Sequence, residues 1–155
     1  MFDSHCHLTD GRFDDDRAAV LARARGAGVR GVVTVASDLD DARLARALAD
    51  AEPDVWCTAG IHPHEAGSAP GDALERIREA ALASRRVVAI GETGLDYHYD
   101  HSPRDVQRRL FRAQIELAGD LGLPFVVHAR SADEDVMAAL ADAPDGAPFV
   151  LHCFS

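Results

Sequence analysis

The chain has 155 residues, of which 47% are hydrophobic, and this length and composition fit one ordinary globular domain. Its formal net charge of −10 argues against the broad basic surface that non-specific nucleic-acid binding requires. No apolar run reaches the roughly 20 residues that cross a bilayer, and nothing at the start resembles a signal peptide, so we expect a cytoplasmic protein.

Short β-rich runs alternate with longer Ala-, Leu- and Arg-rich stretches along the chain. The runs predict strands at 1–3, 31–36, 55–59, 87–91, 125–128 and 149–153. The stretches between them predict helices at 17–27, 40–51, 71–84, 104–121 and 133–141. The strands are continuous apolar runs such as GVVTV and FVVH, which is typical of a parallel sheet covered by helices. A doubly wound sheet and a (β/α)₈ barrel both have this rhythm.

The cysteines, Cys6, Cys57 and Cys153, are odd in number and lie within apolar or histidine-containing segments. This pattern does not suit a disulfide framework. We predict free, buried thiols, and contact between one of them and a metal stays open.

Five of the six predicted strands deliver a His or a Glu at their carboxyl end. These residues are His5, His7, His62, His64, Glu92, His128 and His152. In a barrel of parallel strands all carboxyl ends meet at one rim, where the active site is built. An open sheet would spread the same residues along a line. The pattern therefore favours a TIM-type (β/α) barrel.

Several histidines and a single glutamate form a ligand set for cations such as Zn²⁺, Mn²⁺ or Ni²⁺. Glu92 is the one carboxylate among them, and a carboxylate can bridge two metals. The chain has no lysine, so a carbamylated lysine cannot take that place. His62 and His64 could contact either metal or substrate. Arg130 could hold a substrate phosphate or pair with an acid such as Asp96.

The segments FDSHCHL, GIHPH, AIGETGLDYHYDHSPRDVQ, LPFVVHARSADED and LHCFS resemble, in order and spacing, the TatD family of metal-dependent hydrolases. The resemblance runs along essentially the whole chain. It implies a TIM-type barrel, two divalent metal ions (Zn, Mg, Mn or Ni) and hydrolysis of phosphodiester bonds in DNA. It assigns His5 and His7 to one metal and His128 and His152 to the other, with Glu92 as the bridging catalytic residue. In a nuclease, His62, His64 and Arg130 would be the substrate-binding residues that hold phosphate.

Family members are usually longer, so the resemblance also predicts a single barrel domain over 1–155 that is C-terminally truncated. It would hold about six of the eight βα units and lack the Glu-Thr-Asp motif whose aspartate completes the metal site. Because six strands cannot close a barrel, we expect an open, partly formed barrel with exposed edges.

The leading interpretation is a TatD-like deoxyribonuclease that acts on DNA ends or short oligonucleotides. We expect it to bind no membrane and to need no obligate protein partner. One alternative keeps the barrel but changes the substrate to another phosphoester, a lactone or an amide. Another is a catalytically inactive metal-binding fragment, because the last aspartate is missing.

Overall fold

The computed structural model describes all residues from 1 to 155, and its centre is one sheet of six parallel strands. The strands are β1 (Asp3–Cys6), β2 (Val32–Thr34), β3 (Val55–Ala59), β4 (Val87–Asp96), β5 (Phe125–Arg130) and β6 (Phe149–His152). The helices are α1 (Arg17–Gly26), α2 (Leu39–Ala51), α3 (Ala73–Leu82), α4 (Arg104–Leu121) and α5 (Asp133–Ala141), with short 3₁₀ helices η1 (Gly11–Phe13) and η2 (Pro63–Ser68).

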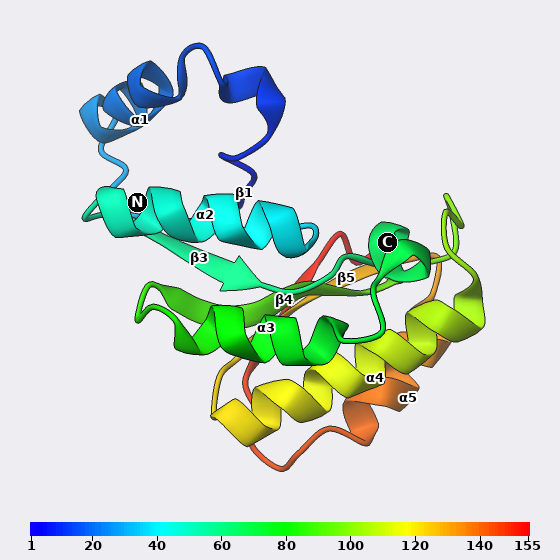
Figure 1. Cartoon of the computed structure of the whole chain (residues 1–155). Helices are drawn as coiled ribbons and strands as arrows, with labels where there is room; N and C mark the ends of the chain where they lie inside the picture. The colour runs from blue at the N-terminus through cyan, green and yellow to red at the C-terminus, as the bar shows by residue number, and fades with distance from the viewer.

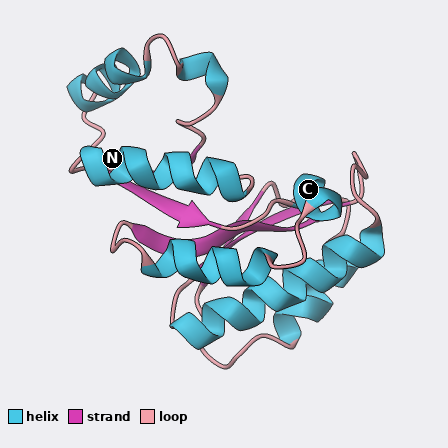
Figure 2. Cartoon of the chain, in the orientation of Figure 1, coloured by secondary structure: helices cyan, strands magenta, loops and turns pink.

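The strands lie in chain order, β1 to β6, without any reversal. A doubly wound sheet reverses its strand order at a switch point, so that architecture is excluded. Helices α2 to α5 follow one another along one side of the curved sheet, while α1 stands beside its β1 end (Figure 1; Figure 2). The molecule is therefore an incomplete TIM-type barrel, as the sequence predicts.

β4 is longer than its predicted range and changes the position of two acids. It pairs with β5 from Ile90↔Phe125 to Asp96↔Arg130, with a register shift between Ile90 and Thr93. Glu92 and Asp96 therefore lie within the strand, and the predicted strand end at residue 91 is wrong. The reason is that backbone pairing continues beyond the apolar run that marks the strand in the sequence.

The core is one contiguous cluster between the sheet and the helices covering it. Phe111 of α4 and Phe125 of β5 are its largest fully buried side chains. All three cysteines are free, as predicted, but only Cys57 is buried; Cys6 and Cys153 are half-buried.

β1 and β6 each pair with a single neighbour, which confirms the open barrel. Phe149 and Val150 of β6 and Phe2 beside β1 are exposed. None of the helices has the combination of length and apolar character that a membrane span requires.

A buried glutamine on α4 holds the segment that follows β3 in place. Gln114 Oε1 accepts the backbone N–H of Ile61 at 2.9 Å, and its Nε2 donates to Ile61 O and to Thr93 Oγ1 at 3.1 and 2.7 Å. All polar atoms of this side chain are thus paired although it is fully buried. The helix therefore fixes the backbone that carries His62.

We expect Gln114→Leu to lower the free energy of unfolding by about 2–4 kcal/mol, because it leaves the buried Ile61 backbone groups and the Thr93 hydroxyl without partners. Urea unfolding followed by circular dichroism measures the change. Glu116→Leu, at an exposed position on the same helix, is the control and should shift stability by less than about 0.5 kcal/mol. Equal effects of the two substitutions would contradict the role given to Gln114.

Candidate metal centre

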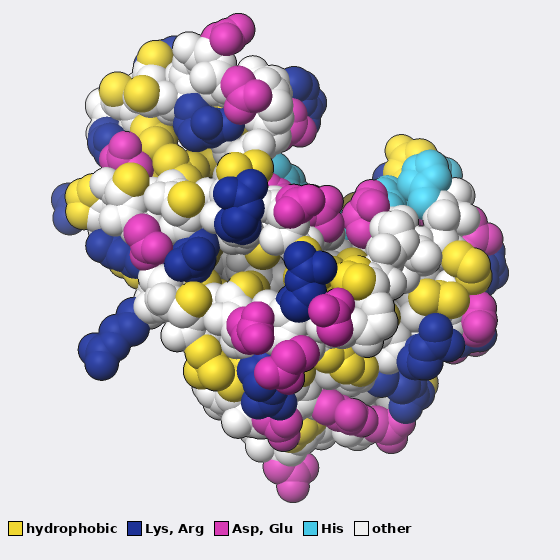
Figure 3. Space-filling view, viewed as in Figure 1, with side chains coloured by type: hydrophobic (Ala, Val, Ile, Leu, Met, Phe, Trp, Pro, Cys, Tyr) yellow, Lys and Arg dark blue, Asp and Glu magenta, His cyan; other side chains and the backbone are white.

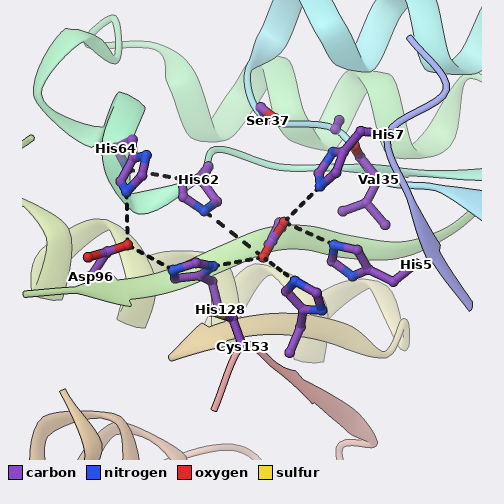
Figure 4. A network of polar contacts seen from close by, with 12 residues as sticks. His5, His7, Val35, Ser37, His62, His64, Asp96, His128 and Cys153 are labelled. Carbon is purple, nitrogen blue, oxygen red and sulfur yellow. Dashed lines mark hydrogen bonds and ion pairs between the residues drawn. The ribbon is translucent and has the colours of Figure 1, made fainter. Parts of the chain in front are cut away.

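Five histidines surround the buried carboxylate of Glu92 at the carboxyl ends of the strands (Figure 4). The Oε2 atom lies 3.3 Å from His5 Nε2 and 3.7 Å from His7 Nε2. Distances from Oε1 are 3.0 Å to His128 Nδ1, 4.0 Å to His62 Nε2 and 4.0 Å to His152 Nε2. The structure thus brings together all five predicted metal ligands, and His62 with them.

Close backbone approach places Glu92 at this point. A Cβ on Gly60 would lie 2.6 Å from Gly91 Cα, so only glycine lets the end of β3 approach β4 so closely. The Gly91–Glu92 peptide is cis, and the Glu92 N–H donates to Ala36 O beyond β2 at 3.0 Å. The loops after β2 and β3 therefore fix the backbone beneath the carboxylate.

Ligand atoms fall into two groups that share Glu92. One is His5, His7 and Glu92, and the other is His62, Glu92 and His128; within each group the atoms lie within 4.8 Å of one another. This spacing suits two cations joined by one carboxylate.

The ring nitrogens of His5 indicate whether the centre suits a cation, because they lack hydrogen-bond partners. Both ring nitrogens of His5 are buried without a hydrogen-bond partner, and the 3.3 Å contact of Nε2 with Glu92 lacks hydrogen-bond geometry. Burying an imidazole in this way is costly unless its lone pair has a ligand. The donor set fits a divalent cation.

His7 has its tautomer fixed by the backbone. Its Nδ1 lies 2.9 Å from Val35 O, and a carbonyl can only accept, so Nδ1 carries the proton. The lone pair of the neutral ring is then on Nε2, which faces Glu92. A backbone carbonyl that orients a histidine in this way is typical of metal ligands.

His62 differs from His7 although it lies at a similar distance from the carboxylate. Its Nδ1 accepts the backbone N–H of His64 at 3.1 Å, so the neutral ring carries its proton on Nε2. Burial lowers the pKa of His62 to about 3 despite the nearby Glu92, which keeps the ring neutral. Nε2–H is therefore a hydrogen-bond donor that faces the cavity, and it suits a substrate oxygen better than a metal.

His128 lies between two carboxylates. Its Nδ1 is 3.0 Å from Glu92 Oε1, and its Nε2 is 3.0 Å from Asp96 Oδ2 (Figure 4). Burial opposes protonation, but the hydrogen bonds to Glu92 and then Asp96 raise the pKa of His128. With Nε2–H held by Asp96, Nδ1 is the nitrogen that could bind a metal.

Asp96 is a buried acid whose function the sequence reasoning missed. Burial would raise its pKa, but a hydrogen bond from the Tyr99 backbone, followed by those from His64 and His128, lowers the pKa to about 2. Its Oδ2 accepts a hydrogen bond from each of two imidazoles, at 2.9 Å from His64 Nε2 and 3.0 Å from His128 Nε2. The strand length could have revealed this role, because Asp96 ends the strand that carries Glu92.

The Glu92 carboxylate is stabilised in its charged form. Burial opposes ionisation, yet the hydrogen bond with His128 and the nearby imidazoles of His5 and His62 lower the pKa of Glu92. His152 stacks on His5 with ring centroids 3.6 Å apart, and burial lowers the pKa of His152. The centre therefore combines an ionised carboxylate with two imidazoles, His62 and His152, whose pKa is lowered by burial.

The other predicted substrate residues lie beside this centre. His64 bonds to Asp96 and does not contact Glu92, while Arg130 lies over the Tyr99 ring at 4.6 Å. Arg130 does not pair with Asp96, which is the alternative that the sequence leaves open. The Oδ2 atom of Asp96 is already bonded to the imidazoles of His64 and His128.

A cavity of about 700 Å³ opens above Glu92. On the side of α2 its wall is acidic and includes Asp38, Asp40 and Asp41. Acidic side chains also appear near the notch on the face seen in Figure 3. No arginine lines the cavity.

Comparison with known proteins identifies the family. The family model described as TatD related DNase matches residues 2–155. The chain belongs to this family. It is 42% identical over 157 residues to the 3'-5' ssDNA/RNA exonuclease TatD of Musicola paradisiaca (strain Ech703), covering 100% of this chain and 59% of that protein. It is also 38% identical over 159 residues to the metal-dependent hydrolase YabD of Bacillus subtilis (strain 168), covering 61% of that protein.

A solved structure supports the TatD fold. The TatD homologue YJJV of Escherichia coli K12 superimposes with a TM-score of 0.91 at 30% identity, over 100% of this chain and 60% of that one. The chain thus spans about 60% of the length of these TatD relatives.

Proposed function

We propose that this chain carries the dinuclear metal centre of a nuclease that hydrolyses phosphodiester bonds in single-stranded DNA or RNA from the 3' end. The observation that carries the proposal is the buried, ionised Glu92, with His5 and His7 near one carboxylate oxygen and His128 and His152 near the other. The relatives named as 3'-5' ssDNA/RNA exonucleases supply the substrate and the direction. We also propose that residues 1–155 form a single domain of the barrel type and that the protein is cytoplasmic.

His5 and His7 would hold one divalent cation and His128 and His152 the other, with Glu92 between them. When bound, the cations supply Lewis-acid activation of water and neutralise charge on the phosphate. Val35 O orients His7. The fold therefore fixes the orientation of these side chains before the substrate enters.

Substrate contacts come from groups that do not hold metal. The Nε2–H of His62 is directed into the cavity and can donate to a non-bridging phosphate oxygen. Arg130 carries a permanent charge near the same rim and can bind a second phosphate oxygen. Held by these donors, the phosphodiester would lie over the Glu92 carboxylate.

The test is a cleavage assay of the purified chain with Mg²⁺ or Mn²⁺ on single-stranded oligonucleotides labelled at the 5' end. We expect a ladder of products that shorten one nucleotide at a time, and no such ladder with EDTA. Metal binding without cleavage of DNA or RNA would reject the nuclease proposal and leave the metal centre. If the chain cleaves only small phosphoesters, lactones or amides, the proposed nucleic-acid substrate is wrong and that class of compound takes its place.

Asp96→Asn tests the orientation of His128. An amide NH₂ facing the ring would favour the tautomer with the proton on Nδ1, which removes the lone pair that a metal needs. We expect the affinity for Mn²⁺, measured by calorimetric titration, to fall about 10–100-fold. Asp135→Asn, which alters a half-buried partner of Tyr97 away from Glu92, is the matched control and should leave the affinity unchanged. Unaltered affinity in Asp96→Asn would contradict this positioning role.

A further inference from the structure

The loop between β4 and α4 presents an aromatic surface beside the metal centre. Tyr99 is 51% exposed and lies parallel to His101, with an interplanar angle of 3° and centroids 5.6 Å apart. His64 meets both rings edge-on, at 5.6 Å from Tyr99 and 4.6 Å from His101. A histidine and hydrophobic surface caps the projecting loop in Figure 3.

Arg130 at the end of β5 adds a positive charge to this surface. Its guanidinium carbon lies 4.6 Å from the Tyr99 ring centroid, and no acidic side chain lies within 4.0 Å of it. By contrast, Arg104 and Arg108 on the adjacent α4 pair with Asp100 and Asp135. The guanidinium of Arg130 is therefore not neutralised by an ion pair and can bind an anionic ligand.

The surface is connected to the centre through His64. This histidine contacts Tyr99 and donates to Asp96, which in turn holds His128. The centroids of His64 and His128 are 6.1 Å apart. A nucleotide on Tyr99 would therefore lie next to a phosphate at Glu92.

The two sides of the cavity opening above Glu92 differ in charge. The wall near α2 carries Asp38, Asp40 and Asp41, whereas the side of β4 and β5 carries Tyr99 and Arg130. A polyanion is repelled by the first side and attracted by the second. This asymmetry gives a substrate strand one path away from the centre.

We propose that Tyr99, His101 and Arg130 form a stacking platform for one unpaired nucleobase adjacent to the scissile phosphodiester, with the sugar–phosphate backbone passing Arg130. The inference rests on the proposed nuclease function and deepens it. An aromatic face accepts any base, which suits a site without sequence preference. In a duplex the bases are already stacked, so the platform selects single strands.

Binding of oligonucleotides by the full chain tests the platform. The probes are fluorescent single strands with phosphorothioate linkages at the 3' end to slow cleavage, and one abasic site is moved along the first four nucleotides. We expect Tyr99→Ala to weaken binding about tenfold and Tyr99→Phe to change it less than about twofold. Leu82→Ala, at an exposed site on α3, is the control.

The abasic probes decide whether the effect is stacking. At one position the missing base should weaken binding by wild-type protein to the same extent as Tyr99→Ala, and the variant should lose nothing further there. Arg130→Gln should weaken binding to all probes and reduce the salt dependence by about one ion.

The outcomes separate the two proposals. If wild-type protein binds and cleaves the strands while Tyr99→Ala behaves like wild type, the platform is rejected and the nuclease stands. If Tyr99→Ala loses affinity equally at every abasic position, stacking at one nucleotide is also rejected. If wild-type protein neither binds nor cleaves any strand, both proposals fall.

Discussion

Glu92→Gln is expected to lower the affinity for Mn²⁺ by at least about a hundredfold and to abolish hydrolysis. Loss of a partner that only orients a metal ligand costs about 10–100-fold, and Glu92 lies between both ligand groups. The amide keeps the shape of the side chain but removes the negative charge that two cations would share. Calorimetric titration of the metal and the oligonucleotide assay measure the two effects.

Glu65→Gln is the matched control for this substitution. The Glu65 carboxylate lines the same cavity and contacts the Ser68 hydroxyl, and it forms no ion pair with the histidines around Glu92. We expect it to bind the metal as wild type does. Two equivalents of Mn²⁺ bound with unchanged affinity in Glu92→Gln would contradict the bridging position.

The second large effect concerns the backbone beneath His128. Gly94 has φ +132°, and a Cβ at this position would collide with the carbonyl oxygen of His128, its partner across the β4–β5 pair. Because the clash is with backbone, no side chain can move aside. We expect Gly94→Ala to lower the free energy of unfolding by about 4 kcal/mol or more, from strain and overpacking together.

Gly26→Ala is the control for Gly94→Ala. Gly26 is the last residue of α1, its φ is not positive, and a methyl group added there would meet no atom within 4 Å. Alanine there should be neutral or stabilising by up to about 1 kcal/mol. Urea unfolding measures both variants, and a Gly94→Ala protein as stable as Gly26→Ala would contradict the close packing of β4 on β5.

The barrel and the gathering of histidines could be predicted because each depends on a local pattern. Continuous apolar runs mark parallel strands, and His5, His128 and His152 lie at or near strand ends. The convergence of these residues on Glu92 follows from the strand order β1 to β6. No long-range information is needed once the strands are known to be parallel and consecutive.

The finer arrangement could not be predicted because it depends on tertiary contacts. Asp96 lies outside the apolar run of β4, so its hydrogen bonds to His64 and His128 leave no trace in the hydrophobic pattern. The proton position on His62 follows from a backbone N–H that only the η2 turn brings to it. Likewise Arg130 has several acids near it in sequence, and packing of the loop after β4 places it on Tyr99 instead.

Anomalous diffraction from crystals of the Mn²⁺-loaded chain tests the shared position of Glu92 most directly. We predict two peaks about 3.5–4 Å apart, one on each side of the Glu92 carboxylate, with His5 and His7 at one and His128 and His152 at the other. A single peak, or manganese bound away from Glu92, would contradict a dinuclear centre at this carboxylate.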